Sequence, residues 1–252
     1  MIVQQEVWGN IPLLHIYNEK TQKYSPIVLF LHGFESAKEH NLHYAYQLVN
    51  QGCRVILPDA HLHGERDELL DKVEISLRFW ETVLTSIEEV GVLKEELTIR
   101  GYLANQKIGI AGTSMGGITT LGCLTTYPWI DAAVILMGTP GYVELANAQM
   151  EQIEQKGFKI PLTDDERQNM FDTLASFDAT KQMEKLAGKP LFFWHGQKDP
   201  VVPFAPTATF IKEFEKAYGN DNIEFMQEKS AGHAVSRKGM LAATKWLANS
   251  LE

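Results

Sequence analysis

The sequence IGIAGTSMGG occupies residues 108–117 and joins an apolar run to a glycine-rich turn. The apolar run, Ile108–Ala111, predicts a buried strand, and the stretch 118–127 that follows predicts a helix. A Gly-x-Ser-x-Gly motif between a strand and a helix indicates a tight, strained turn that exposes a serine hydroxyl. Small residues are needed on both sides because larger side chains would clash across such a turn. Ser114 is therefore a candidate nucleophile, and the alternative is a glycine-rich loop with a bystander serine.

Further apolar runs lie on both sides of this motif and alternate with helical patterns. The runs are Ile27–Leu31, Val55–Leu57, Ala132–Met137, Leu191–Trp194 and a weaker one, Ile223–Met226. Short, nearly continuous apolar runs are typical of parallel strands that are covered on both faces. Helical spacing of apolar residues occurs between them, over 42–49, 73–87 and 235–251. This alternation predicts a doubly wound α/β fold.

The first residues of the chain follow a different pattern. Ile2–Trp8 and Ile11–Tyr17 flank Gly9-Asn10, which predicts a two-residue hairpin. The complete prediction is a mostly parallel sheet of about eight strands, with an N-terminal antiparallel hairpin and helices on both faces.

Composition limits the class of protein and its partners. The chain has 252 residues, of which 44% are hydrophobic and 22% charged, so it is expected to form one globular domain over 1–252. A net charge of −9 without a basic cluster argues against nucleic acid and anionic membranes as partners. Cys53 and Cys123 have no CxxC or metal-ligand spacing, so we expect buried apolar residues of a protein in a reducing compartment. With no signal-like start and no apolar run of about 18 residues, we expect a cytoplasmic protein; the sequence leaves its oligomeric state open.

Two polar residues follow other predicted strands and complete a catalytic pattern with Ser114. Ligands of such sheets bind at the carboxyl ends of the strands. Asp199 follows the strand 191–194, and His233 follows the strand 223–226. The chain order serine, aspartate, histidine is the one expected for a triad on this architecture. The alternatives are that Asp199 only forms a turn before a proline and that His233 only begins the last helix.

An oxyanion hole is expected from backbone N–H groups near the same strand ends. One donor is predicted at Met115, directly after the candidate nucleophile, and the other at Phe34, after the strand 27–31. Gly33 allows the backbone to pass close to the site.

Several of these motifs together resemble the α/β-hydrolases. They are His32–Phe34, Pro58–Arg66, Gly112–Gly117, His195–Asp199 and Gly232-His233. The sequence is similar, from about residue 11 to the C-terminus, to small bacterial serine esterases related to dienelactone hydrolase and to the catalytic domain of prolyl oligopeptidase. The resemblance implies a Ser114–Asp199–His233 triad with Phe34 and Met115 as oxyanion donors. Dienelactone hydrolase uses a cysteine nucleophile, so a serine at 114 favours general ester hydrolysis.

The expected function is therefore hydrolysis of small esters with short acyl chains through an acyl-enzyme, without a metal or an organic cofactor. One alternative is an aminoacyl-peptide or acyl-amide hydrolase, although the chain lacks the several hundred residues of a propeller domain. The other alternative is a non-catalytic ligand receptor, although such proteins typically lack a triad member.

One cluster of side chains that commonly bind metal ions lies at the end of another strand. Asp59, His61 and His63, with Glu65 nearby, have suitable chemistry, but their spacing matches no known zinc geometry. A structural hydrogen-bonding role is preferred, and no metal is predicted.

The segment 139–189 is far longer than an ordinary crossover, and long excursions are commonly lids. It predicts one helix with an apolar stripe that ends near Gly157 and a second helix that begins with a capping box at Thr163. Because the segment leaves a strand's carboxyl end, we expect an inserted helical cap over Ser114. The acyl pocket is predicted among the apolar side chains of the cap: Met150, Ile153, Phe158, Met170 and Phe171. The alternative is that these side chains merely pack on the core.

Overall fold

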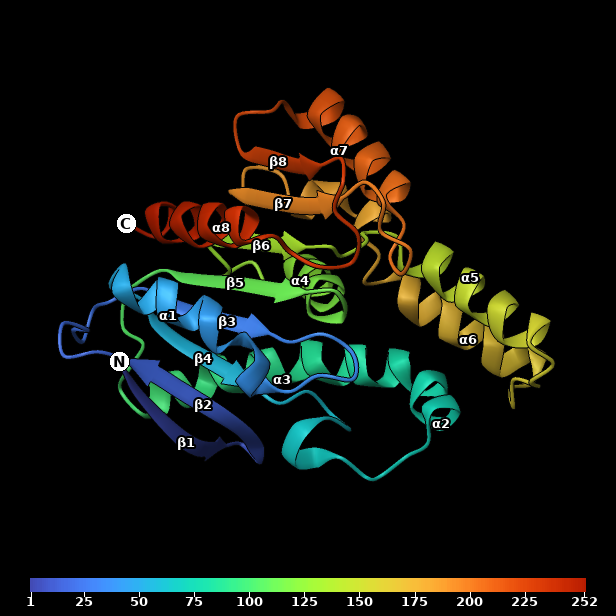
Figure 1. Ribbon diagram of the computed structural model, residues 1–252, viewed down its shortest axis with the longest axis horizontal. Helices are drawn as coiled ribbons and strands as arrows, with labels where there is room; N and C mark the ends of the chain where they lie inside the picture. The colour runs from blue at the N-terminus through green and yellow to red at the C-terminus, as the bar shows by residue number, and fades with distance from the viewer.

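The computed structural model describes all residues, 1–252, and is built on one eight-stranded sheet (Figure 1). The strand order is β1-β2-β4-β3-β5-β6-β7-β8. The strands are β1 (Ile2–Trp8), β2 (Ile11–Tyr17), β3 (Ile27–Leu31), β4 (Arg54–Pro58), β5 (Ile108–Thr113), β6 (Ala132–Leu136), β7 (Leu191–Gly196) and β8 (Ile223–Glu228). Strands β3 to β8 are parallel, whereas β2 pairs antiparallel with both β1 and β4. The predicted α/β-hydrolase architecture is confirmed.

The hairpin turn has the geometry that its sequence predicts. Gly9 and Asn10 have φ values of 55° and 67°, and Trp8 pairs directly with Ile11. Two successive left-handed residues match the twist of the flanking strands, so the two-residue turn fixes the register of β1 and β2.

Helices cover both faces of the sheet. They are α1 (Leu42–Asn50), α2 (Lys72–Leu77), α3 (Phe79–Ile99), α4 (Met115–Thr126), α5 (Tyr142–Gln155), α6 (Asp164–Ala175), α7 (Phe204–Tyr218) and α8 (Arg237–Ser250), with short 3₁₀ turns at Lys38–Asn41, Gly64–Arg66, Ala179–Lys181 and Met183–Lys185. Alternate residues of β3 belong to different cores: Val28 and Phe30 to the apolar cluster that includes residues of α1 and α8, and Leu29 and Leu31 to the one that includes residues of α3, α4 and α7. This alternation follows from the period of two in a strand.

One predicted helical stretch is divided in two. The spacing over 73–87 predicted one continuous apolar face, but the helix breaks at Arg78, where φ is −94° and ψ is 12°. Phe79 and Trp80, at the start of α3, are each only 8% exposed, whereas α2 buries no residue. The change of direction lets α3 bury its two aromatic rings while α2 stays at the surface.

The long excursion between β6 and β7 forms a helical hairpin. Helices α5 and α6 pack on each other and extend beyond the end of the sheet at the right of Figure 1. Gly157, with φ of 84°, follows the end of α5, and Thr163 caps α6 through a reciprocal bond with Glu166, as the sequence predicts. No helix of the structure is both long enough and apolar enough to span a membrane.

Candidate active site

Ser114 lies in the turn between β5 and α4 with a left-handed backbone, at φ 53° and ψ −116°. A residue other than glycine rarely adopts this conformation, and such strain is concentrated at functional sites. The turn persists because the Ser114 N–H donates to Leu136 O at 2.8 Å and Ile118 N–H donates to Ser114 O at 2.9 Å. The arrangement is the strained elbow that the motif predicts.

Steric crowding in the turn explains the glycines at positions 112 and 116. A Cβ atom on Gly112 would lie 2.2 Å from the carbonyl carbon of Gly116, and one on Gly116 would lie 2.2 Å from the carbonyl oxygen of Leu31. Both contacts are with backbone atoms that cannot move aside. The turn therefore excludes every larger residue at these two positions.

Three side chains from separate loops meet at this turn. His233 Nε2 lies 2.8 Å from Ser114 Oγ, and His233 Nδ1 lies 2.7 Å from Asp199 Oδ2. The other carboxylate oxygen of Asp199 accepts hydrogen bonds from the N–H groups of Val201 and Val202, at 2.9 and 3.0 Å. Since a carboxylate only accepts, His233 donates through Nδ1–H, and its free Nε2 lone pair faces the serine hydroxyl. This is the geometry of a nucleophile, a general base and an orienting acid.

The loops that carry Asp199 and His233 are fastened to each other. Lys198 N–H donates to the carbonyl oxygen of Ala231 at 3.0 Å, and a Cβ on Gly196 would lie 2.5 Å from the same oxygen. The close packing of the two loops fixes the distance between the carboxylate and the imidazole.

His195 also contacts this carboxylate, a role that was not predicted from the sequence. Its imidazole is fully buried at the end of β7, donates from Nε2–H to Val202 O at 2.9 Å, and lies 3.4 Å from Asp199 Oδ2. Burial lowers the pKa of His195, so the ring is neutral at physiological pH. Only its place four residues before Asp199 in the strand-end motif indicated that it would be near the site.

The loop after β3 lies directly against the nucleophile. A Cβ on Gly33 would be 3.5 Å from the Cβ of Ser114, and Phe34 N–H donates to no protein acceptor. His32 holds the loop: its Nδ1–H donates to Gly33 O at 2.8 Å, and its Nε2 accepts from Ala60 N–H at 3.0 Å. Burial lowers the pKa of His32 to about 4 and keeps it in the neutral form that these two bonds require.

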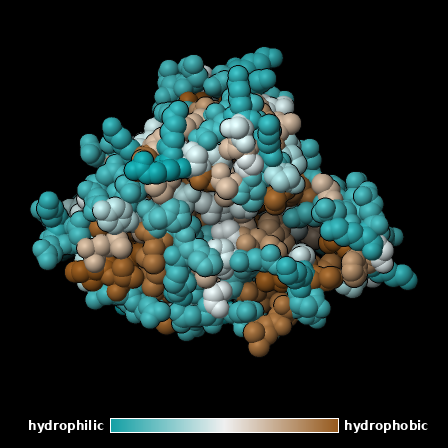
Figure 2. Space-filling model, in the orientation of Figure 1, coloured by the Kyte–Doolittle hydropathy of each residue, from teal (hydrophilic) through white to brown (hydrophobic).

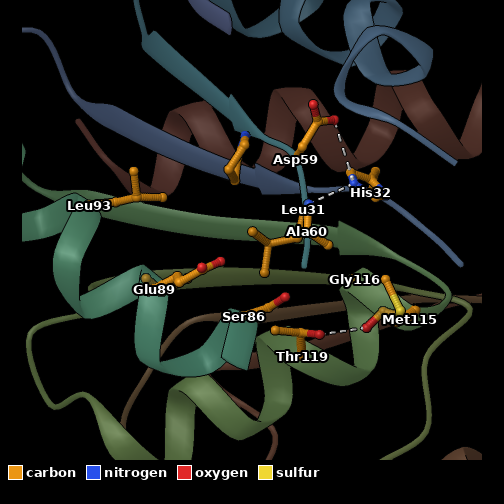
Figure 3. Close-up of a pocket in the computed structure, with 12 residues that line it drawn as sticks. Leu31, His32, Asp59, Ala60, Ser86, Glu89, Leu93, Met115, Gly116 and Thr119 are labelled. Atoms are coloured by element: carbon orange, nitrogen blue, oxygen red, sulfur yellow. Dashed lines mark hydrogen bonds and ion pairs between the residues drawn. The ribbon is translucent and has the colours of Figure 1, made fainter. Parts of the chain in front are cut away.

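Met115 N–H is the second expected oxyanion donor. As the first residue of α4, Met115 has no acceptor for this group within its own helix. Figure 3 shows the packing behind it, where Thr119 Oγ1 donates to Met115 O at 2.9 Å beside a cavity of about 20 Å³. This cavity is too small for an ester and does not include Ser114.

The aspartate, glutamate and histidines after β4, which the sequence offers as possible metal ligands, form hydrogen bonds within the protein. Asp59 is fully buried and accepts from Lys38 Nζ at 2.6 Å and from Glu65 N–H at 3.0 Å. Burial by itself would lower the pKa of Lys38, but its bonds to Asp59 and Glu65 outweigh this effect and raise the pKa. Lys38 and Asp59 thus form a buried ion pair, which the partly exposed Glu65 extends towards the surface.

The two histidines of that loop are engaged as well. His63 Nδ1–H donates to His61 O at 2.8 Å, and His61 Nε2 lies 3.1 Å from Glu81 Oε1. The His63 ring packs edge-on against Phe34, with centroids 5.4 Å apart. The loop therefore supports the backbone that presents the Phe34 N–H.

A cavity of about 330 Å³ opens at Ser114. The oxyanion candidates Phe34 and Met115 line it, with Phe79 from α3 and Val202 from the Asp199 loop. Most of its remaining wall comes from α5, so the long excursion borders the candidate nucleophile. Figure 2 shows a hollow between the projecting helices and the body, with apolar surface on both sides.

The five predicted cap residues do not lie together. Ile153 lines the cavity of Ser114, whereas Met150 and Met170 line a neighbouring apolar cavity that does not include the serine. Phe158 is 48% exposed after α5, and Phe171 packs against the main core.

Besides Ile153, four residues of α5 and its C-terminal end line the serine's cavity without having been predicted from the sequence: Leu145, Gln149, Gln152 and Lys156. Most of them are polar, so the apolar spacing of this segment gave no signal for this face.

Known proteins resemble this chain in sequence. The sequence model of the prolyl oligopeptidase family matches residues 87–252. The Bacillus subtilis protein named "Putative esterase YitV" is 44% identical over 97% of this chain and 97% of its own length. The Escherichia coli protein "Esterase YjfP" is 32% identical over 80% of each chain.

Solved structures share the fold. TT1662 from Thermus thermophilus superposes with a TM-score of 0.78 at 22% identity, and covers 100% of this chain and 99% of its own. The Pyrococcus furiosus esterase Pf2001 gives a TM-score of 0.67 at 18% identity, over 100% of this chain and 93% of its own.

Proposed function

Because the chain belongs to the prolyl oligopeptidase family of α/β-hydrolases and is a carboxylic ester hydrolase, we propose that it cleaves small esters with short acyl chains through Ser114, His233 and Asp199. The observation that carries the proposal is the continuous contact from Asp199 Oδ2 through His233 to Ser114 Oγ, at 2.7 and 2.8 Å.

The first half of the reaction forms an acyl-enzyme. Ser114 Oγ attacks the ester carbonyl carbon as its proton passes to His233 Nε2, and Asp199 stabilises the imidazolium. The negative charge that develops on the carbonyl oxygen is stabilised by the N–H groups of Phe34 and Met115. His233 then returns the proton to the alkoxide as the C–O bond breaks, and the alcohol leaves.

The second half repeats these steps with water. His233 Nε2 removes a proton from the water, whose oxygen attacks the acyl carbon and forms a second oxyanion. Collapse of this intermediate breaks the bond to Ser114 Oγ, which recovers the proton from His233. The products are a carboxylic acid and the free enzyme, and the cycle consumes no cofactor.

The size of the cavity supports small substrates. About 330 Å³ has to hold the acyl group and part of the alcohol together, which is the lower end of the range for ligand pockets. Ester rather than amide hydrolysis is supported by the two relatives named as esterases. We also propose a cytoplasmic location, supported by Cys53 and Cys123 as buried free thiols.

Covalent labelling tests the assignment of the nucleophile. A fluorophosphonate is expected to modify Ser114, as read by peptide mass spectrometry, and to abolish hydrolysis of p-nitrophenyl acetate. Ser114→Ala is expected to lose the label and to lower kcat by about 10³-fold or more. Near-parental hydrolysis by Ser114→Ala would reject the triad, and faster turnover of aminoacyl amides than of acetyl esters would favour the peptidase alternative. An intact protein with neither a label nor ester turnover would favour the receptor.

A further inference from the structure

A second, apolar cavity of about 110 Å³ lies beside the cavity of Ser114. It is bordered by α2, α3, α5, α6 and the segment that leads into α6. Its apolar lining includes Trp80, Ala146, Met150, Ile160, Leu162 and Met170. The mechanism proposed above uses none of these side chains. We call this space the side chamber.

The side chamber and the cavity of Ser114 share a wall. Ser76, Gln149 and Ile153 line both spaces. Trp80 Nε1 donates to Gln149 Oε1 at 2.9 Å, which holds the amide of Gln149 to one side. Ile153 is the apolar member of the wall, so movement of its side chain between rotamers is the simplest way to open a passage.

The position of the side chamber around α5 indicates which part of a substrate it faces. Successive residues of a helix are rotated by about 100°. Glu144 and Gln155 therefore lie on one side of α5, Lys156 in the middle and Met150 on the other side. Glu144 and Gln155 line a third, polar cavity beside Pro200 and Val201. Lys156 lines the cavity of Ser114, and Met150 lines the side chamber.

The direction of proton transfer indicates which side of the cavity of Ser114 holds the alcohol and which side holds the acyl group of the ester. His233 has to protonate the leaving alkoxide, so the alcohol leaves on the side of His233 and of the loop that carries Asp199. That loop contributes Pro200 and Val201 to the polar flank. The acyl group therefore extends in the opposite direction, towards Ile153 and the side chamber.

We propose, on the basis of the ester hydrolase mechanism above, that the side chamber binds the distal end of an unbranched aliphatic acyl chain. An apolar cavity of about 150 Å³ holds a benzene-sized molecule, so 110 Å³ accommodates about four methylene groups. The chamber extends the substrate range from short acyl esters to straight-chain esters of medium length, and Ile153 controls entry. Branched or bulky acyl groups stop at Ile153.

Two substitutions test the chamber from opposite directions, with p-nitrophenyl esters from acetyl to decanoyl as substrates. Met170→Trp fills the chamber from α6 and is expected to lower kcat/KM for the octanoyl ester by about tenfold, with acetyl ester turnover unchanged within about twofold. Ile153→Ala removes the wall and is expected to raise the ratio of octanoyl to acetyl kcat/KM several-fold. Phe158→Ala, in an exposed side chain that lines neither space, is the matched control and is expected to keep the wild-type profile.

The outcomes separate this proposal from the assignment of the nucleophile. Unchanged chain-length profiles in both variants, with Ser114 still labelled by a fluorophosphonate, would overturn the side chamber and leave the triad in place. Absence of both labelling and hydrolysis in the wild-type protein would instead overturn the proposed function. If Met170→Trp fails to fold, as judged by far-ultraviolet circular dichroism, Met170→Phe and Ile153→Ala decide the question.

Discussion

At the scale of single residues, the candidate site depends on buried histidines that stay neutral. His32 and His195 are each buried and bridge backbone or carboxylate groups around the serine. Neutral imidazole offers one N–H donor and one lone pair, so His32 can accept from Ala60 N–H while donating to Gly33 O. Protonation would turn its acceptor nitrogen into a donor and break the bond to Ala60.

Because the fold needs His32 in its neutral form, the free energy of unfolding depends on pH. The pKa of His32 is about 4 in the folded state and about 6.5 in an unfolded chain. As the pH falls from 7 to 5, the unfolded chain gains a proton at this position and the folded protein does not, so the free energy of unfolding falls. The contribution of His32 to this fall is about 2 kcal/mol.

His32→Gln keeps a donor and an acceptor without a titrating group, and urea unfolding at pH 7 and pH 5 measures the effect. Between pH 7 and pH 5, we expect the free energy of unfolding to fall by about 2 kcal/mol less in the variant than in the wild type. An equal slope in His32→Gln would show that His32 does not carry this dependence.

The residues of the site differ in how far the sequence could predict them. Ser114, Asp199 and His233 were predictable because each follows an apolar strand, and strand ends meet at one edge of a parallel sheet. His195 also follows an apolar run, but its contact with Asp199 depends on which side of β7 its ring faces, and the sequence does not specify that. Whether the three side chains catalyse is the prediction that labelling tests.

At the scale of elements, α5 and α6 show where local pattern stops being informative. Their caps were predictable because Thr163, Glu166 and Gly157 act on neighbouring backbone. The surface that each helix face meets was not, since the direction of the hairpin depends on its packing against α2 and α3. The apolar stripe with Met150 turns towards the side chamber, and the more polar face with Gln149 and Gln152 reaches the serine's cavity.

The cap of α6 is expected to stabilise the hairpin measurably. Thr163 Oγ1 accepts from Glu166 N–H at 3.3 Å, and Glu166 Oε2 accepts from Thr163 N–H at 2.8 Å. Thr163→Ala removes the capping hydroxyl and is expected to cost about 1 kcal/mol of unfolding free energy in chemical denaturation. Trypsin cleavage after Lys156 and Lys159, in the exposed turn before the cap, is expected to become faster.

Thr173→Ala is the matched control for this prediction. Thr173 is exposed in the interior of the same helix and bonds back to Asn169 O, where alanine is the better helix former. We expect this variant to be as stable as the wild type or slightly more stable. Equal destabilisation by both substitutions would contradict a specific role for the cap.

At the scale of the whole molecule, the excursion 139–189 is joined to the main core. Tyr142 Oη donates to Ile118 O at 2.6 Å, and the Tyr142 ring packs at 4.9 Å from Trp80. Leu174 and Leu186 are fully buried in the same apolar cluster as the sheet and α3. The hairpin therefore shares buried surface with the body instead of folding around a core of its own.

This sharing predicts one cooperative unfolding transition for residues 1–252, because a segment without a separate core cannot stay folded when the body opens. The native thiols Cys53 and Cys123 are buried, so a cysteine placed at the exposed Asn169 of α6 can carry a fluorophore selectively. Urea unfolding of this labelled variant, followed by the fluorophore and by far-ultraviolet circular dichroism, is expected to give coincident midpoints and equal m-values. An earlier fluorophore transition would mean that α5 and α6 open as a separate unit, and substrates would then enter through a mobile hairpin instead of a fixed cavity.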